Sequence, residues 1–406
     1  MIGIAAQRYD VIVAGARCAG SATAMLLAQQ GLRVLVVDPA RRGSDTLSTH
    51  ALMRSAVVQL HRWGLLDEIQ RSGAPAIRRT TFHYGDEVVP VDIREKDGVD
   101  ALYAPRRTVL DRVLGDAARE AGAVVAYGHS VTGLCHDRDG RVVGAEITDA
   151  TQTTVSVGAE LVIGADGVRS RVARLVGARK SYEAPHKACS IYGYLRDLPR
   201  DGNHWYYGNG VAAGAIPTNG ATCVFTSIPS ALFEGRRDKG LVQLYREALQ
   251  VSPELANLVE DAGGPDKLRA FPGIRGFLRE SIGPGWALVG DAGYFRDPLT
   301  AHGISDALRE AELISRAILN GTEDALTDYQ ANRDQRVRGL LDVTDRIASL
   351  EWSLATVKEE HLALTREMKS LGDLVRSDEG HAAVYGRRPR QKGERLWKSE
   401  TQRVAV

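Results

Sequence analysis

YDVIVAGARCAGSATAMLLAQQGLRVLVVD, residues 9–38, is the stretch that decides the fold. An apolar, β-branched run at residues 11–13 leads into a glycine-containing turn, and residues 21–30 then have the composition of a helix. A second buried strand follows at residues 32–37. The pattern predicts a βαβ unit and therefore an α/β protein with a Rossmann-like domain.

The turn inside this unit has the residues that a nucleotide pyrophosphate requires. Gly15 permits the turn, Gly20 permits close helix packing, and the helix N-terminus directs free N–H groups toward the phosphates. Asp38 stands where a carboxylate accepts hydrogen bonds from a ribose diol. Arg17 replaces the usual middle glycine, and its backbone can still approach the phosphates if its side chain points away. The expected nucleotide contacts are therefore Gly15, Arg17, Cys18, Ala19, Gly20 and Asp38.

Two further segments place glycine and aspartate directly after a strand. LVIGADGVRS, residues 161–170, runs from a strand through Asp-Gly into a helix start. WALVGDAG, residues 286–293, is a second strand that ends in Gly-Asp. It is followed by DPLTAHGI, residues 297–304, and by a helical pattern over residues 305–319. Three such motifs in this order favour one shared nucleotide site over three unrelated turns.

In this order the three motifs resemble those of the class A flavoprotein monooxygenases, which have the para-hydroxybenzoate hydroxylase-like FAD fold. The resemblance covers about residues 9–347. The sequence departs from the common family pattern where Gly293 and Tyr294 follow Gly-Asp-Ala and where Ala301-His302-Gly303 replaces Gly-Gln-Gly. These departures resemble the branch shared with geranylgeranyl reductases and flavin-dependent halogenases.

The resemblance assigns roles around a bound FAD. It implies that Asp291 binds the ribityl chain, that Pro298 lies at the flavin ring, and that the backbone N–H groups near Gly303 and Ile304 face the pyrimidine edge. His302 and Tyr294 are the candidates for catalytic roles beside the ring. The remaining cofactor contacts that it implies are Arg107, Val131, Asp166, Gly167, Gly290 and Ala301.

These anchors divide the chain into a discontinuous FAD-binding domain and an insertion. The insertion has alternating strand patterns, which predict a mixed β-sheet that covers the flavin and holds the substrate. A C-terminal helical segment and an Arg/Lys-rich tail follow. The predicted boundaries are 1–78, 104–178 and 274–345 for the FAD-binding domain, 79–103 and 179–273 for the substrate domain, 346–375 for the helices, and 376–406 for the basic tail.

Composition excludes several other classes of protein. A formal net charge of +1 and a sequence pI of about 7.7 give no field that favours nucleic acid or a membrane surface. The four cysteines are widely separated, which predicts neither a metal site nor a disulfide framework. No apolar run is long enough for a membrane helix. We expect a cytoplasmic monomer or homodimer.

For function, the resemblance implies an FAD-dependent monooxygenase. NADPH or NADH would reduce FAD, O2 would add to it, and a flavin C4a-hydroperoxide would hydroxylate or epoxidise an apolar or aromatic small molecule. The aromatic residues of the insertion favour such a ligand, in specialised metabolite biosynthesis.

Alternatives are also open. A flavin-dependent halogenase is disfavoured because AAGAIP, residues 212–217, lacks both tryptophans of the halogenase motif Trp-x-Trp-x-Ile-Pro. A prenyl-type alkene reductase suits residues 297–304. A non-redox cyclisation catalyst or binding protein that contains FAD has no residue that favours it positively.

Overall fold

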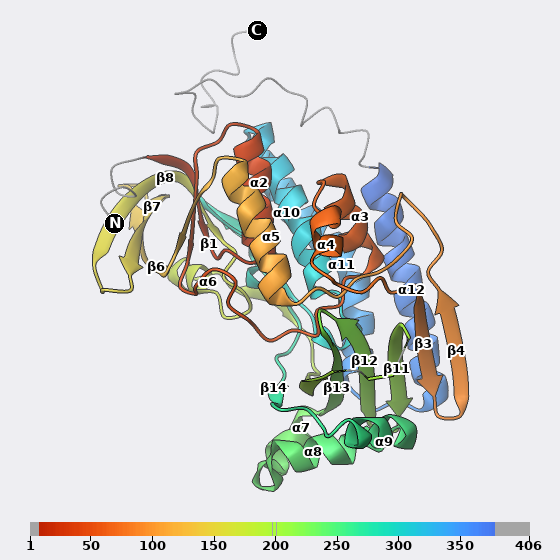
Figure 1. Cartoon of the computed structure of the whole chain (residues 1–406). Helices are drawn as coiled ribbons and strands as arrows, with labels where there is room; N and C mark the ends of the chain where they lie inside the picture. The colour runs from red at the N-terminus through yellow and green to blue at the C-terminus, as the bar shows by residue number, and fades with distance from the viewer. Residues whose placement is uncertain (1–7, 197, 200, 378–406) are drawn as a thin grey trace.

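The computed structural model describes residues 8–196, 198–199 and 201–377 (Figure 1). It confirms an α/β chain with a Rossmann-like domain, a second sheet and C-terminal helices. Of the predicted basic tail, residues 378–406 lie outside the described part.

The first sheet has eight strands and contains the predicted βαβ unit. Its strand order is β16-β17-β8-β1-β2-β5, with β6 and β7 joined to β8. The four neighbours β17, β8, β1 and β2 are parallel, and β5 continues parallel to β2. The strands are β1 (Tyr9–Ala14), β2 (Val34–Asp38), β5 (Val124–Tyr127), β6 (His129–His136), β7 (Val142–Asp149), β8 (Thr154–Gly164), β16 (Ile282–Gly283) and β17 (Trp286–Leu288).

Three helices stand together beside this sheet: α2 (Cys18–Gln29), α5 (Arg107–Glu120) and α10 (Gly303–Asn320) (Figure 1). Their apolar side chains share a core cluster with Val11, Val13 and Ile163 of the sheet. The opposite side chains of β1 and β8 pack with the β6–β7 hairpin in a second cluster. The central strands are therefore buried on both faces, as expected for parallel strands.

The second sheet has seven strands in the order β14-β10-β13-β12-β11-β3-β4. The two segments of the insertion, residues 79–103 and 179–273, pair with each other in this sheet, because β3 of the first segment lies parallel to β11 of the second. GNGVAAG, residues 208–214, has glycines between two strand patterns, and this sequence alone predicts a hairpin turn. The two-residue connection between β11 and β12 confirms it. The strands are β3 (Arg79–Tyr84), β4 (Glu87–Asp92), β10 (Ala188–Leu195), β11 (Asn203–Gly208), β12 (Val211–Thr218), β13 (Ala221–Pro229) and β14 (Arg269–Phe271).

This sheet has an outer and an inner face. Helices α7 (Ser230–Gly235), α8 (Gly240–Leu249) and α9 (Pro253–Asp261) lie at the outer face, at the bottom of Figure 1. The inner face shares its core cluster with the helices of the first sheet. The second sheet therefore packs against the first domain through its inner side chains.

The remaining elements join the two sheets. A three-stranded sheet consists of β9 (Lys180–Glu183), β15 (Phe277–Arg279) and β18 (Tyr294–Phe295), so β9 pairs outside the seven-stranded sheet. Short helices α3 (Arg54–Arg62) and α4 (Leu66–Arg71) follow the loop after β2. Helix α11 (Glu323–Ala348) and helix α12 (Leu354–Ser377) pack on each other. Within the described ranges, no helix has both the length and the apolar character needed to cross a membrane.

Helix α12 docks on the second sheet through His361. Its Nδ1 lies 2.8 Å from the hydroxyl of Tyr84, and its ring centre lies 4.5 Å from that of Tyr207. Lys358, one turn earlier, pairs with Glu87 of β4. Burial lowers the pKa of His361 to about 4, so the docked imidazole is neutral at neutral pH.

We predict that this histidine makes stability pH-dependent. Between the folded pKa of about 4 and the ordinary value of 6.5, the unfolded chain binds more protons than the folded chain. Relative to the His361→Gln variant, the wild type should therefore lose stability as pH falls from about 6.5, by at most about 1.4 kcal/mol per pH unit. Urea unfolding of both proteins across this window measures the difference. A difference that does not change with pH would contradict the prediction.

Candidate active site

The three predicted motifs meet at one edge of the first sheet. Strands β17, β8 and β1 are parallel neighbours, so their carboxyl ends lie side by side. Gly15, Asp166 and Gly290 follow these three ends. β1 connects through α2 to β2 on one side, while β8 lies on its other side. Ligands of open α/β sheets bind at such a switch point.

Glycines allow the motifs to touch. Gly15 has φ +111°, and a Cβ there would lie 2.3 Å from the carbonyl oxygen of Ala165. A Cβ at Gly20 would lie 1.9 Å from the carbonyl oxygen of Gly15. Gly290 has φ +61°, and its Cβ would lie 2.9 Å from the Cβ of Ala19. A side chain at any of the three positions would separate the motifs.

Asp38 fixes the first turn from the end of β2. Its Oδ2 accepts a hydrogen bond of 2.8 Å from the backbone N–H of Ala16, and its Oδ1 accepts one of 2.8 Å from Ala40. The carboxylate therefore holds the glycine turn against the second strand. Each oxygen keeps further lone pairs for a ribose hydroxyl.

Asp111 organises the side chains behind the turn. Its Oδ1 accepts hydrogen bonds from Arg107 Nε at 3.1 Å and Nη2 at 2.9 Å, and from Cys18 Sγ at 3.3 Å. Its Oδ2 pairs with Arg17 Nη1 at 3.2 Å. The Arg17 side chain is thereby tied to α5. Burial raises the pKa of Cys18, so this thiol stays protonated.

Sequence reasoning missed Asp111, although one signal was present. Asp111 lies four residues after Arg107, and two oppositely charged side chains at that spacing face each other on a helix.

Asp291 and Asp166 have different surroundings. Burial raises the pKa of Asp291 to about 7, and the positive charge of Arg107 opposes that shift. The Oδ2 of Asp166 accepts from the backbone N–H groups of Arg171 at 2.6 Å and Val172 at 3.2 Å, at the start of α6 (Arg171–Leu175). Its Oδ1 is buried, with no hydrogen-bond partner in the described part of the chain.

Val131 and Gly167 flank this edge. The side chain of Val131 is buried in β6, and its carbonyl oxygen accepts from Arg171 Nη1 at 3.3 Å. Gly167 has φ +79°, and no atom lies within 4 Å of the place where a Cβ would stand. The structure thus leaves open space beside the Asp-Gly turn.

The start of α10 is the second free helix N-terminus at the site. A 3₁₀ turn over Pro298–Thr300 and a left-handed residue, Ala301 (φ 56°), lead into it. Gly303 is exposed, and no atom lies within 4 Å of a Cβ built there. The first N–H groups of a helix have no partner within the helix, so those of Gly303 and Ile304 can face a ligand.

Asp297 ties this segment to the second sheet. It accepts hydrogen bonds from the backbone N–H of Leu299 at 3.0 Å and of Ala188, at the start of β10, at 2.8 Å. Asp297 therefore connects the loop before α10 to the start of β10 in the second sheet.

The two candidate catalytic residues lie in different places. His302 is buried directly before α10, and its Nε2 lies 3.0 Å from the Sδ of Met368 on α12. Burial lowers the pKa of His302 to about 3, so its imidazole is neutral. Tyr294 packs in a core cluster with Val337 and Leu341 of α11.

Aromatic residues cover the inner face of the second sheet. Trp205 and Phe225 pack edge to face at 5.3 Å, and Tyr192 and Tyr194 at 5.9 Å. These side chains share a core cluster with Leu299 and Ala301 of the loop before α10. We call this set the aromatic face: Tyr192, Tyr194, Trp205, Tyr207 and Phe225.

His50, in the loop after β2, meets this face. It has φ 69°, a left-handed backbone conformation that few residues other than glycine adopt. Its Nε2 lies 2.5 Å from the hydroxyl of Tyr194, and burial lowers its pKa to about 3. The hydroxyl of Tyr192 accepts from the backbone N–H of Ser48 at 3.1 Å. The loop after β2 is thus hydrogen-bonded to β10.

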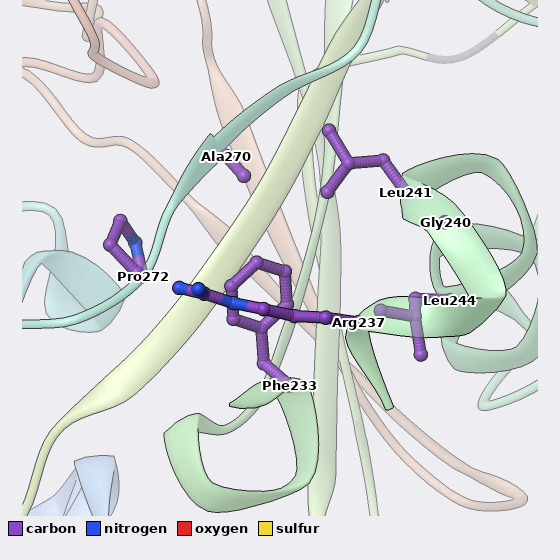
Figure 2. A pocket seen from close by; sticks show the side chains of 7 residues that line it. All are labelled: Phe233, Arg237, Gly240, Leu241, Leu244, Ala270 and Pro272. Carbon is purple, nitrogen blue, oxygen red and sulfur yellow. The ribbon is translucent and has the colours of Figure 1, made fainter. Parts of the chain in front are cut away.

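A separate pocket of about 410 Å³ lies on the outer face of the second sheet. Figure 2 shows Arg237 beside Phe233, with Leu241 and Leu244 from α8 and Pro272 opposite. The Arg237 guanidinium carbon lies 5.4 Å from the Phe233 ring centre. Phe233 and Leu244 belong to the outer core cluster, so this pocket is distinct from the site at the three motifs.

The residues at the three motifs fit FAD. Two helix N-termini, at α2 and α10, offer unpaired N–H groups to anionic parts of the cofactor. Positions that a Cβ would fill remain open at Gly167 and Gly303. The carboxylates Asp38 and Asp291 supply acceptors for hydroxyl groups, and the buried Oδ1 of Asp166 still lacks a donor.

We predict that Asp111 is required for stability. Its replacement by alanine leaves the buried Arg107 guanidinium without its carboxylate and should cost about 3–5 kcal/mol. Chemical denaturation of the full chain measures this loss. In the matched control Asp100→Ala, which breaks an exposed pair with Arg78, the unfolding midpoint should stay at the wild-type value. Equal losses in the two variants would contradict the role of Asp111.

Comparisons with known proteins identify the family of the chain. A family model described as an FAD binding domain matches residues 8–344. The chain is 27% identical over 311 residues to digeranylgeranylglycerophospholipid reductase 1 of Methanococcoides burtonii, covering 74% of this chain and 72% of that protein. It is also 27% identical over 353 residues to menaquinone reductase of Mycolicibacterium smegmatis, covering 80% of this chain and 79% of that protein.

Solved structures share the fold at lower identity. PqsL of Pseudomonas aeruginosa, described as a probable FAD-dependent monooxygenase, superimposes with a TM-score of 0.72 at 21% identity, covering 89% of this chain and 100% of that chain. Because the family model matches most of the chain, the chain belongs to the FAD-binding-domain family of FAD-dependent oxidoreductases.

Proposed function

We propose that the chain reduces a carbon–carbon double bond of an apolar or aromatic small molecule, with FAD as cofactor and NADPH or NADH as electron source. The observation that carries the proposal is the partly buried Tyr194–His50 pair on the aromatic face, a proton donor next to the predicted flavin site. The two relatives described above support it, because both are named as reductases.

FAD, when bound, would supply a carrier that accepts a hydride from the nicotinamide and delivers it to the substrate. The chain's part begins at the N-terminus of α10. Its free N–H groups at Gly303 and Ile304 and its positive dipole end stabilise negative charge that develops on the cofactor. The neutral His302 directly before this helix adds no net charge of its own.

The aromatic face binds the substrate in this proposal. Four of its five side chains are buried in the shared core and only Tyr194 is partly exposed, so an apolar substrate would reach this face at Tyr194. Helix α12 covers part of the same face through His361 and Tyr207, which keeps water out. The substrate would therefore lie between the second sheet and the start of α10.

Reduction of a double bond adds a hydride to one carbon and a proton to the other. Burial raises the pKa of Tyr194, so its hydroxyl stays protonated at neutral pH and can donate to a strongly basic carbon. His50 Nε2 lies 2.5 Å from that hydroxyl. In the tautomer that carries its proton on Nε2, His50 donates to the Tyr194 oxygen and leaves the Tyr194 proton free for the substrate. In this scheme Tyr194 is the proton donor and His50 is a positioning residue.

Oxygen transfer, as a monooxygenase, is the second candidate. The same aromatic face and the same helix N-terminus would exclude water and stabilise charge in that reaction, and PqsL shares the fold. In this alternative O2 is consumed and His302 remains the proposed residue beside the ring, whereas Tyr294 lies in the separate core cluster with α11.

The mass of the product distinguishes the two reactions. We predict that the FAD-loaded protein, NADPH or NADH, and a prenylated quinone or polyene give a product with two added hydrogen atoms, and that turnover continues without O2. A product with one added oxygen atom, formed only in air, would establish the monooxygenase instead. If neither nicotinamide reduces the flavin with any substrate, both candidates fail.

Two matched variants assign the proton donor. Tyr194→Phe should retain flavin reduction by the nicotinamide but lower product formation by about 100-fold, the usual contribution of a positioned acid. Tyr206→Phe removes a hydroxyl from the outer face of the same sheet and should leave both steps unchanged. Equal turnover in the two variants would remove Tyr194 from the mechanism.

A further inference from the structure

Two arginines meet one aspartate at the junction of the two sheets. Asp45 lies in the loop after β2, Arg106 stands directly before α5, and Arg269 lies in β14. Arg269 Nη2 is 3.2 Å and Arg106 Nη2 is 3.5 Å from the same Oδ2 of Asp45. Two guanidinium groups on one carboxylate leave one positive charge uncompensated within this cluster.

The cluster borders the aromatic face. The Arg106 guanidinium carbon lies 3.6 Å from the ring centre of Tyr194, and that of Arg269 lies 5.5 Å from it. Arg106 is also held through its backbone N–H, which donates to Asn219 Oδ1 at 2.9 Å. Both arginines are therefore fixed beside the proposed proton donor.

Two nitrogen atoms near this cluster have no hydrogen-bond partner among the described residues. The Nε of Arg106 is buried without a partner among the residues that the structure describes, and so is the Nδ1 of His50. Arg106, Asp45 and Arg269 still keep 22, 26 and 27% of their side-chain surface exposed. A ligand can thus reach a prepared pair of guanidinium forks, which match the two oxygens of an anion.

We infer that Arg106 and Arg269 form a binding site for an anionic oxygen group, a carboxylate or a phosphate, and that Asp45 holds the two arginines until that group displaces it. The inference rests on the proposed function only in placing a substrate on the aromatic face. The anion could belong to the substrate, or it could be the ribose phosphate that distinguishes NADPH from NADH.

If this is an anion site, replacing an arginine and replacing the aspartate should change the affinity for an anion in opposite directions. Arg269→Gln removes one fork and should weaken anion binding by about tenfold or more. Asp45→Asn removes the competing carboxylate and should strengthen binding of the same ligand. If the Asp45–arginine contacts only stabilised the fold, the two substitutions would not change anion affinity in opposite directions, because each would break the same ion pair.

The test measures binding to the full-length, FAD-loaded protein by calorimetry. Benzoate and uncharged benzamide probe a substrate carboxylate. NADP+ and NAD+, which cannot reduce the flavin, probe the ribose phosphate. In one of these pairs we expect the member with the additional anionic group to bind more tightly than its partner, Arg269→Gln to abolish that preference, and Asp45→Asn to increase it. The pair that responds identifies the source of the anion.

Controls separate the site from folding and from net charge. Arg78→Gln removes an exposed arginine that pairs with Asp100 and should leave both preferences unchanged. If Arg269→Gln does not fold, Arg269→Lys keeps the charge but loses the fork and should show a reduced preference. Preferences that survive Arg269→Gln, or weaker anion binding in Asp45→Asn, would overturn the inference. Neither readout requires turnover, so failure of the proposed reaction would be seen separately.

Discussion

The close approach of three backbone segments at the carboxyl edge of the first sheet is the constraint on which the rest of the structure depends. Gly15 stands against the carbonyl of Ala165, Gly20 stands against Gly15, and Gly290 stands against Ala19. These contacts place the ends of three parallel strands and the start of α2 within one cofactor's reach. A single Cβ at any of these points would force the segments apart.

Buried polar contacts hold the second helix N-terminus in the same place. The backbone N–H of Gly290 donates to Glu310 Oε2 at 3.0 Å, which fixes α10 against the Gly-Asp turn. Arg296 and Arg309 both pair with Asp306 at 2.8 Å near the start of α10. Burial raises the pKa of Glu310 to about 7. These groups are costly to bury, and they hold α10 with its N-terminus at the proposed flavin site.

Short sequence patterns predicted those structural units that form between neighbouring segments of the chain. The βαβ unit and the β11–β12 hairpin follow from glycine turns between apolar strands, and the structure confirms both. The Tyr194–His50 pair and the Met368–His302 contact join residues that are 144 and 66 positions apart in the sequence, so no local spacing pattern predicts either contact. The pairing of β9 with β15 was missed for the same reason, because short strands find partners through tertiary packing.

Equilibrium binding of FAD to the apoprotein tests most directly whether the three motifs form one FAD site. Flavin fluorescence titration should show one FAD bound per chain, with affinity at least about tenfold lower in Asp291→Ala and about tenfold lower in Gly303→Asp, which sets a negative charge at the α10 N-terminus. Unchanged affinity in both variants, with the fold intact, would contradict the account and place FAD elsewhere.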